Sequence, residues 1–297
     1  APGGFTMYTN FRQGDTAYGY TYKGLDGLTT TDNWASGDCN MQLQIESPNY
    51  AHSALAIGLE LVNNDSATAS GLRDSLIIEL AEWIKGLGKR PVFLRIGYEF
   101  DGDFNHYDPE YYKLAFRRIK NMFDSLQVKN YVTVWQSKGW GSDTTELLKY
   151  YPGDKYVDWC SYTHFVWGVE GGQPMVDFAR AHNKPILIGE ATPMIFQGDT
   201  IPVDCFLDNH EQALLAWDSY FIPLFKMIDD NPDVIKAISY ISVDWPSQKM
   251  WANNTPFKHV DSRLHINDTI KTRWNREIGK NKYLKASPDL FDYLWNE

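Results

Sequence analysis

The fold of this chain is decided by Pro91-Val-Phe-Leu-Arg-Ile-Gly-Tyr-Glu-Phe-Asp-Gly102. This stretch predicts a short buried strand that opens into a loop carrying Glu99. A continuous apolar run that ends at glycine and polar residues is typical of a parallel strand covered on both faces. The segment Lys184-Pro-Ile-Leu-Ile-Gly-Glu190 repeats the same design. We therefore expect two glutamates at the same end of one parallel sheet.

Strands and helices alternate along most of the chain. Strands are predicted at 54–62, 92–96, 131–136, 156–164, 185–189 and 234–243, with weaker candidates at Phe5–Tyr8 and Met41–Ile45. Helices are predicted at 71–87, 109–123, 144–150, 175–182, 211–229 and 267–277. This alternation predicts an α/β fold, a (β/α)8 TIM barrel with an irregular first unit. No linker divides the sequence, so we expect a single catalytic barrel domain over residues 1–297.

Composition narrows the classes of partner. The 297 residues carry a net charge of −10, and the basic residues are scattered, which disfavours nucleic acid and an anionic membrane surface. No apolar stretch is long enough for a transmembrane helix. The chain contains 11 Trp and 18 Tyr. These aromatic residues favour either an aromatic core or a groove that stacks sugar rings, and a neutral polysaccharide or oligosaccharide substrate fits the charge.

The sequence gives no sign of a metal or cofactor. Cys39, Cys160 and Cys205 lack metal-ligand spacing, and both one disulfide with a free thiol and three buried thiols remain open. Zinc, calcium-loop and phosphate-loop motifs are missing. The start at Ala1 fits either the residue after a cleaved leader or an arbitrary edge. We expect a secreted monomer without cofactor.

Glu99 and Glu190 lie 91 residues apart (190 − 99) and follow the fourth and seventh strands of the expected barrel. Glycoside hydrolysis needs one protonated and one ionised carboxyl group, about 5–5.5 Å apart in retaining enzymes. Opposite strands of a small barrel can present such a pair. The alternative is that each glutamate caps a helix or pairs with Arg95, but the repeated strand design favours the catalytic interpretation.

The motif Leu94-Arg-Ile-Gly-Tyr-Glu99 resembles the strand-4 motif of glycoside hydrolase family 26, the β-mannanases and β-1,3-xylanases of clan A. The resemblance extends over residues 54–245. It implies that Glu99 is the acid/base and Glu190 the nucleophile. Tyr98 departs from the pattern, since most of the clan has Asn at this position and family 26 mannanases commonly have His.

The resemblance also implies a residue on the sixth strand that hydrogen-bonds the nucleophile, and a Trp beneath the reacting sugar. Tyr162 and His164 are the candidates for the first role, and Trp245 for the second. We expect Arg95 to bridge carboxylates, Glu99 or Glu60, because an unpaired buried charge is costly. A core position is the alternative for several of these side chains. The other predicted substrate-binding residues are Tyr98, Asp101, Trp135, Gln136, Trp140 and Trp167.

The function expected from the sequence is that of a secreted, retaining, endo-acting β-glycoside hydrolase. A neutral cell-wall polysaccharide, β-1,3-xylan or β-mannan, is the favoured substrate. The alternatives are a hydrolase of another plant or algal β-glycan, a non-catalytic carbohydrate-binding barrel, and a metal-dependent barrel enzyme.

Overall fold

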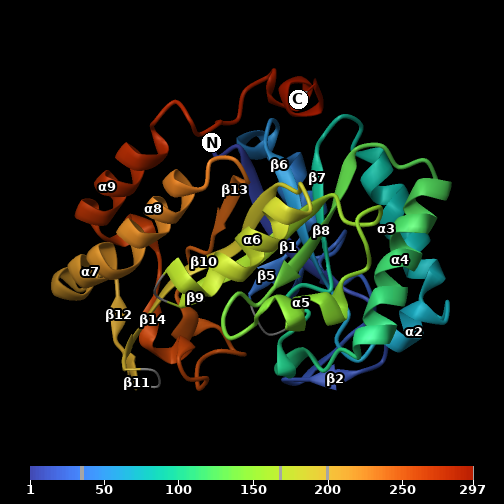
Figure 1. Ribbon diagram of the computed structural model, residues 1–297, viewed down its shortest axis with the longest axis horizontal. Helices are drawn as coiled ribbons and strands as arrows, with labels where there is room; N and C mark the ends of the chain where they lie inside the picture. Colours follow the sequence, from blue (N-terminus) through green and yellow to red (C-terminus); the bar gives the residue numbers. More distant parts are fainter. Residues whose placement is uncertain (34–36, 167–168, 199–200, 297) are drawn as a thin grey trace.

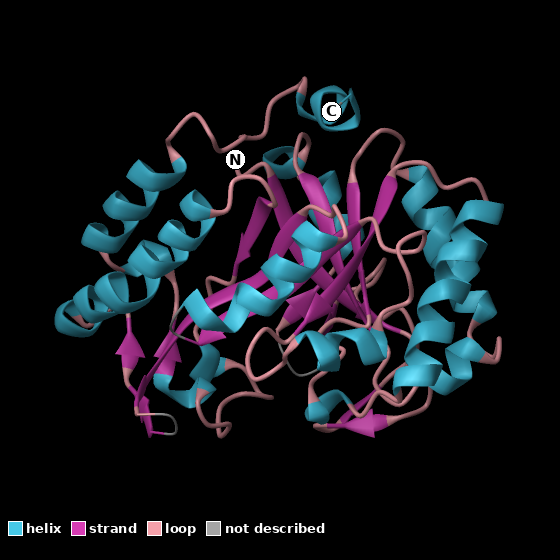
Figure 2. Ribbon diagram, in the orientation of Figure 1, coloured by secondary structure: helices cyan, strands magenta, loops and turns pink. Residues whose placement is uncertain are grey.

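A curled parallel β-sheet forms the centre of the molecule (Figures 1 and 2). The computed structural model describes residues 1–33, 37–166, 169–198 and 201–296. The sheet has the order β1-β6-β7-β8-β9-β10-β13, and each neighbouring pair of these strands is parallel. These strands are β1 (Gly4–Asn10), β6 (Ala54–Glu60), β7 (Val92–Ile96), β8 (Tyr131–Ser137), β9 (Trp159–Val166), β10 (Ile186–Gln197) and β13 (Ile235–Tyr240).

The two edge strands of this sheet approach each other. Thr6 Oγ1 on β1 and Ser239 Oγ on β13 lie 2.6 Å apart. Within the described residues, however, no backbone ladder joins β1 to β13. The sheet therefore curls most of the way round a barrel, and a side-chain hydrogen bond bridges the seam.

Helices pack around the outside of the curled sheet (Figure 1). The longer ones are α3 (Asp74–Gly86), α4 (Pro109–Ser125), α6 (Gln173–Ala181), α8 (Ile222–Asp230) and α9 (Asp268–Ile278). Shorter helices are α1 (Met41–Glu46), α2 (Asp65–Ala69), α5 (Thr144–Tyr150), α7 (His210–Ala216) and α10 (Leu290–Asn296). A π-helical turn at Trp217–Phe221 joins α7 to α8. Small strands outside the parallel sheet are β2 (Thr16–Ala17), β3 (Tyr20–Thr21), β4 (Asp32–Asn33), β5 (Asp38–Cys39), β11 (Ile201–Val203), β12 (Cys205–Phe206) and β14 (Val260–Asp261).

Helix α4 shows how local sequence directs a chain segment onto the sheet. Asp108 caps its first turn by accepting hydrogen bonds from the backbone N–H groups of Glu110 and Tyr111, and Pro109 suits the first helical position. The side chains it buries recur at three- and four-residue spacing, which defines one apolar face. They are Tyr112, Ala115, Phe116, Ile119 and Phe123.

The alternation of strands and helices from residue 54 onward is confirmed, but the eight-stranded barrel is not. The predicted strand Met41–Ile45 is helix α1. Its apolar residues alternate as in a strand, yet Leu43 is exposed and only Met41 is buried. Asn40 accepts a hydrogen bond from the N–H of Leu43 and starts the helix. The first 50 residues thus add one strand to the parallel sheet, and the described part of that sheet has seven.

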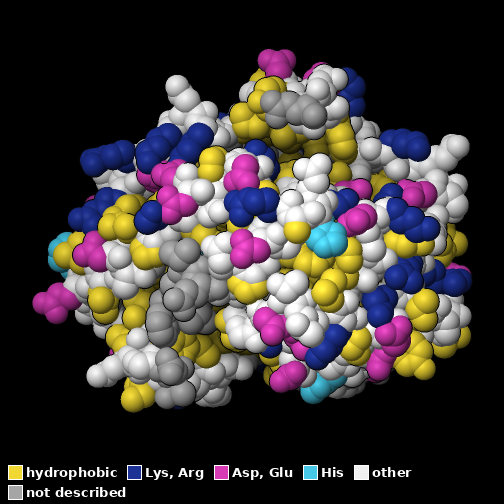
Figure 3. Space-filling view, in the orientation of Figure 1, with side chains coloured by type: hydrophobic (Ala, Val, Ile, Leu, Met, Phe, Trp, Pro, Cys, Tyr) yellow, Lys and Arg dark blue, Asp and Glu magenta, His cyan; other side chains and the backbone are white. Residues whose placement is uncertain are grey.

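The C-terminal segment returns to the amino-terminal ends of the strands. Pro2 pairs with Lys285 in a β-bridge, and Trp295 Nε1 on α10 donates to the carbonyl of Lys89, 2.7 Å away. This segment therefore covers the end of the sheet opposite to Glu99 and Glu190. None of the described helices is long and apolar enough to cross a bilayer. On the face shown in Figure 3, acidic and basic side chains are interspersed.

Tyr112 fastens α4 to the end of β7, because its buried hydroxyl donates to the carbonyl of Ile96, 3.0 Å away. We expect Tyr112→Phe to reduce the free energy of unfolding by about 0.5–1.5 kcal/mol, since it removes a buried hydrogen bond. The exposed neighbour Tyr111 is the control, and Tyr111→Phe should change stability by no more than about 0.5 kcal/mol. Urea denaturation of both variants checks this, and equal stabilities would contradict it.

Candidate active site

Glu99 is presented by a tight turn at the carboxyl end of β7. Gly97 and Glu99 both have positive φ angles, 55° and 53°. The left-handed region is unfavourable for a glutamate, so the surroundings must hold it there. Asn105 Nδ2 does so by donating to the carbonyl oxygens of Tyr98 and Glu99, at 3.1 and 3.0 Å. The turn directs the Glu99 side chain to the edge where the strands end.

The Glu99 carboxyl group is set up to hold a proton. Its side chain is buried, and Oε1 has no hydrogen-bond partner among the described residues. Burial and then the charge of Glu190 raise the pKa of Glu99 to about 8. A hydrogen bond from the Thr163 hydroxyl and the charge of Arg95 act in the opposite direction. Glu99 is therefore protonated at neutral pH and positioned close enough to Glu190 to feel its charge.

Glu190 on β10 is paired with a guanidinium group inside the sheet. Arg95 Nη2 on β7 donates to Glu190 Oε1, and Arg95 Nη1 donates to the carbonyl of Gly189 at 3.3 Å. Arg95 is fully buried (0% exposed) and Glu190 nearly so. Arg95 and Glu190 thus form a buried ion pair.

A chain of polar side chains joins the two glutamates across four adjacent strands. Arg95 Nε donates to Gln136 Oε1 at 2.7 Å, and Gln136 Nε2 donates to Thr163 Oγ1 at 2.9 Å. The Thr163 hydroxyl then donates to Glu99. A Cβ at position 189 would lie 2.5 Å from Gln136 Oε1, so Gly189 leaves the room for this chain. Each strand from β7 to β10 thus contributes at least one member.

Tyr8 and Tyr98 enclose Arg95. The guanidinium carbon of Arg95 lies 5.2 Å from each ring centroid, and the two rings meet edge to face at 5.6 Å. A Cβ at Gly58 would lie 2.5 Å from the Tyr8 ring, so glycine is needed beneath it. The Tyr8 hydroxyl also hydrogen-bonds Glu190. Sequence reasoning did not select Tyr8, although it ends the weaker strand candidate Phe5–Tyr8.

Three predicted substrate-binding residues are internal and cannot reach a sugar. Arg95, Gln136 and Trp135 are all fully buried. Trp135 stacks on Phe100 at 4.4 Å and belongs to the core. Arg95 and Gln136 position the glutamates instead. The pairing expected for Arg95 is also corrected, because it pairs with Glu190.

Glu60, the other partner considered for Arg95, pairs with Arg12 on the adjoining loop. Arg12 Nη1 lies 3.2 Å from Glu60 Oε1. Burial raises the pKa of Glu60 to about 7, and Arg12 opposes the rise. This second buried pair stands at the same strand ends but, on the contacts described, is separate from the Arg95 network.

The sixth-strand candidates lie on the opposite side of β9 from the one expected. Tyr162 and His164 do share a face, but that face packs against the helices: the Tyr220 hydroxyl donates to the His164 carbonyl at 2.6 Å, and their rings lie 5.4 Å apart. Burial lowers the pKa of His164 to about 4, so it is neutral. Side chains alternate along a strand, and the intervening Thr163 faces the glutamates. The hydrogen bond to Glu190 comes from Tyr8.

Trp140 and Trp245 follow β8 and β13 at the carboxyl end of the sheet. Trp140 lies near-parallel to Phe104 and to Phe165, with centroids 6.5 Å from each. Trp245 is mostly buried against Phe257 at 4.7 Å, and its Nε1 donates to Thr192 Oγ1 at 3.3 Å. Trp167 lies outside the described residues.

The cysteines take no part in this site. Cys39, Cys160 and Cys205 are free and buried, which settles the choice left open by their spacing. Among the residues that the structure describes, no group of three His, Cys, Asp or Glu side chains is arranged to hold a metal ion.

Two buried glutamates on a parallel sheet, Glu99 just after β7 and Glu190 within β10, are the arrangement expected of a glycoside hydrolase of clan A. The profile of glycosyl hydrolase family 26 matches residues 52–243. This match covers more than half of the chain, and the chain therefore belongs to glycosyl hydrolase family 26. The resemblance seen in Leu94–Glu99 is confirmed.

Two relatives are similar along most of this chain. A β-1,3-xylanase, TXYA, from Vibrio sp. is 32% identical over 288 residues, which are 91% of this chain and 60% of the relative. A β-1,3-xylanase from Alcaligenes sp. is 30% identical over 286 residues, which are 91% of this chain and 59% of the relative. The chain thus spans less than two thirds of the length of these relatives.

Solved structures share the fold at low identity. A family 26 β-mannanase from Bacteroides ovatus gives a TM-score of 0.56 at 14% identity, covering 84% of this chain and 76% of the other. Xylanase 10B from Thermotoga petrophila, solved in complex with xylobiose, gives 0.56 at 12% identity, covering 82% and 79%. These likenesses support the curled α/β architecture.

Removal of Arg95 should be far more costly than removal of a surface arginine. Arg95→Met leaves Glu190 as a buried unpaired charge, and we expect a loss of about 3–5 kcal/mol in the free energy of unfolding. Arg118, which pairs with Asp74 with about a third of each side chain exposed, is the matched control. Arg118→Met should cost about 0–1 kcal/mol. Denaturant unfolding measures both, and comparable losses would refute the assigned role of Arg95.

Proposed function

We propose that this chain is the catalytic part of an endo-acting, retaining glycoside hydrolase that cleaves β-1,3-xylan. The observation that carries the proposal is a pair of buried glutamates, of which Glu99 has a raised pKa and Glu190 is paired with Arg95. Burial and the Glu190 charge keep Glu99 protonated, whereas Arg95 and Tyr8 face Glu190. A pair with one proton donor and one carboxylate is what the double-displacement reaction requires.

In the first step, a Glu190 carboxylate oxygen attacks the anomeric carbon and the glycosidic C–O bond breaks. Glu99 gives its proton to the departing oxygen, so the leaving chain departs as a neutral alcohol. Glu190 becomes an ester and loses its negative charge. Because that charge is one cause of the raised pKa of Glu99, its loss lowers the pKa of Glu99.

In the second step, Glu99 acts as the base. It takes a proton from water, the water oxygen attacks the anomeric carbon, and the bond to Glu190 breaks. Two inversions leave the product with the β configuration of the substrate. Arg95 then again faces a free carboxylate, and the two glutamates have returned to their starting protonation states.

The choice of β-1,3-xylan rests on the two relatives named as β-1,3-xylanases, which are similar over 91% of this chain. The half-buried Trp140 and the aromatic cluster around Trp245 supply ring faces at the carboxyl end of the sheet, and sugar rings stack on such faces. Both remain proposed sugar-binding residues, as does Tyr98 beside Arg95. Secretion is proposed together with this polymeric substrate, which does not enter cells intact.

Replacement of each glutamate should reduce activity, for a different reason in each case. We expect Glu190→Gln to remove activity on every substrate, because no nucleophile remains. Glu99→Gln should slow hydrolysis of β-1,3-xylan by about 10²–10⁴-fold, the usual contribution of a general acid. The kcat/KM for release of dinitrophenol from a dinitrophenyl β-1,3-xylo-oligosaccharide should fall much less, because that leaving group departs without a proton, whereas kcat should still fall because water attack needs Glu99 as base.

The measurement is product release from β-1,3-xylan, β-1,4-xylan, β-mannan and mixed-linkage glucan, with the first-formed anomer identified by proton NMR. Glu277→Gln, on the outer helix α9, is the control and should behave as the wild type. An initial α product would exclude the retaining mechanism. Activity on β-mannan alone would replace the proposed substrate, and activity in Glu190→Gln would remove the nucleophile assignment.

The pH dependence of kcat/KM should report the proton on Glu99. The free enzyme needs this proton, so kcat/KM should fall tenfold per pH unit above the raised pKa of about 8. Thr163→Val removes the hydrogen bond that lowers this pKa, so the alkaline decline should move to higher pH. The buried Thr133 on β8, which bonds the Tyr156 carbonyl, is the control. A Thr163→Val profile that coincides with that of Thr133→Val would contradict the connection between Thr163 and Glu99.

A further inference from the structure

Strand β10 has an extra residue directly before Glu190. Ile188 lies opposite Tyr162 on β9 and Glu190 lies opposite Thr163, so the intervening Gly189 has no counterpart on β9. Side chains normally alternate along a strand, and an extra residue re-aims the side chain that follows it. A Cβ at Gly189 would point into the same buried network that Glu190 enters. The direction of Glu190 therefore depends on how the strand is held beyond this bulge.

The pairing of β9 and β10 is interrupted a second time just beyond Glu190. The register shifts between Ala191 and Met194, where two residues of β10, Thr192 and Pro193, face a single residue of β9. Proline has no N–H to give to a neighbouring strand and within sheets is found at edges and bulges. A regular ladder of backbone hydrogen bonds therefore does not fix the segment that follows the nucleophile.

The hydroxyl of Tyr220 occupies this second break. It donates to the carbonyl of His164 on β9 at 2.6 Å, and it accepts a hydrogen bond from the N–H of Thr192 on β10. Tyr220 is only 1% exposed, so both bonds are shielded from water. One phenol oxygen thus joins the two strands that carry Thr163 and Glu190.

The π-helical turn brings Tyr220 to this position. The N–H of Ile222 bonds the carbonyl of Trp217, five residues earlier, whereas an α-helix bonds to the fourth residue earlier. Pro223 follows and lacks the N–H that would continue the α-helical pattern. Single π-helical turns of this kind occur frequently at functional sites. The extra residue in the turn changes which side chains can face the sheet, and here Tyr220 faces it.

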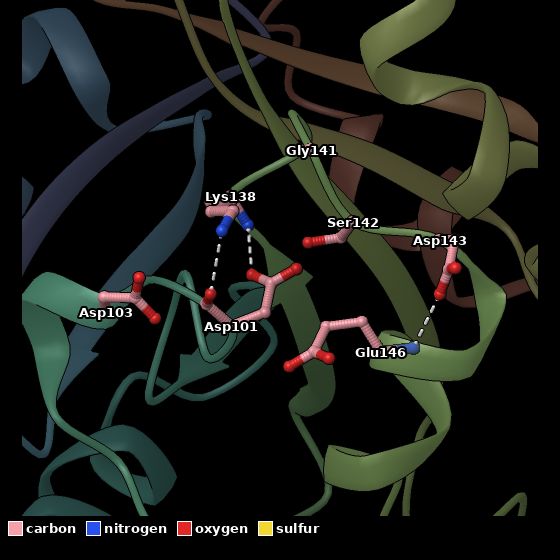
Figure 4. Close-up of a pocket in the computed structure, with 7 residues that line it drawn as sticks. All are labelled: Asp101, Asp103, Lys138, Gly141, Ser142, Asp143 and Glu146. Atoms are coloured by element: carbon pink, nitrogen blue, oxygen red, sulfur yellow. Dashed lines mark hydrogen bonds between the residues drawn. The ribbon is translucent and has the colours of Figure 1, made fainter.

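The turn of Glu99 is anchored separately. Asp101 accepts a hydrogen bond from the N–H of Lys138 at 2.7 Å, and Lys138 Nζ donates to the carbonyl of Asp101 at 3.0 Å (Figure 4). These bonds join the loops after β7 and β8 and do not involve β10. Removal of the Tyr220 hydroxyl should therefore disturb Glu190 and leave the turn of Glu99 in place.

We propose that Tyr220 is a positioning residue for the nucleophile, whose hydroxyl bridges the interrupted pairing of β9 and β10 and so fixes the direction of Glu190. The inference rests on the proposed hydrolase function and adds a residue that does not touch the substrate. Thr192 also accepts a hydrogen bond from Trp245 Nε1 at 3.3 Å, so the bridged segment contacts the aromatic cluster as well. A purely structural tyrosine would affect stability without a selective effect on attack by Glu190.

The first test measures the step in which Glu190 attacks. For a dinitrophenyl β-1,3-xylo-oligosaccharide, kcat/KM reports this attack because the leaving group needs no proton. We expect Tyr220→Phe to lower this kcat/KM by about tenfold, since a small misplacement of a reacting group is costly. The Kd of a short β-1,3-xylo-oligosaccharide product should stay within about twofold of the wild-type value, because the lost interaction acts on the reaction and not on binding. Glu99→Gln should change the same kcat/KM much less, which separates a nucleophile defect from an acid defect.

Tyr240→Phe is the matched control. Tyr240 on β13 donates to the carbonyl of Ser262 at 2.8 Å, so each variant loses a hydrogen bond from a tyrosine hydroxyl to a backbone carbonyl. We expect a lower melting temperature in both variants, and wild-type kcat/KM in Tyr240→Phe. Equal kcat/KM in the two variants, measured well below both melting temperatures, would show that Tyr220 acts on stability alone and would overturn the proposal.

Two further measurements do not depend on turnover. Removal of the hydroxyl leaves the Thr192 N–H without its acceptor, so amide hydrogen exchange at Thr192 should be faster in Tyr220→Phe and unchanged in Tyr240→Phe. The carboxyl carbon NMR signal of Glu190, assigned with Glu190→Gln, should shift in Tyr220→Phe only. If the wild type hydrolyses none of the polysaccharides, the proposed function fails, and these two measurements decide the inference about Tyr220. Faster exchange together with a shifted signal would support it, and an unchanged value of either would overturn it.

Discussion

The buried guanidinium of Arg95 is the constraint on which this site depends. A charge with no exposed surface must be neutralised and hydrogen-bonded, and Arg95 meets that demand with Glu190, Gln136 and the Gly189 carbonyl. These partners stand on different strands, so one side chain fixes the relative positions of β7, β8 and β10. The ion pair with Glu190 therefore both offsets the cost of burying Arg95 and positions the attacking carboxylate.

The residues around Arg95 are small or flat because the network needs space. Glycines 58 and 189 leave room for the Tyr8 ring and for Gln136. Tyr8 and Tyr98 cover the guanidinium with ring faces, which exclude water while stabilising a cation. Low water content strengthens every charge interaction nearby, including that between Glu190 and Glu99. The pKa of Glu99 is raised first by the burial of Glu99 itself and then by the Glu190 charge, and the charge of Arg95 limits the rise.

Sequence patterns predicted the parts of this arrangement that are periodic. The strands from residue 54 onward and the position of Glu99 just past β7 follow from local spacing, and the structure places them where expected. The ion-pair partner of Arg95 could not be predicted from the sequence, because Glu99 and Glu60 were also candidates. The curl of the sheet brings Glu190 on β10 to Arg95 on β7. The prediction that His164 on β9 faces the glutamates was wrong. Side chains alternate along a strand, so a shift of one residue places Thr163 on that face and His164 on the other. The strand predicted at Met41–Ile45 is a helix, because apolar residues that alternate over only five positions fit a short capped helix equally well.

Asp101 connects the loops around the acid to its chemistry. Its carboxylate accepts hydrogen bonds from Ser137 Oγ at 2.6 Å and from the N–H of Lys138 at 2.7 Å, so it is held between the loops after β7 and β8. The charge of Asp101 is among those that raise the pKa of Glu99. The acid therefore keeps its proton partly because a neighbouring carboxylate is fixed in place by hydrogen bonds from β8.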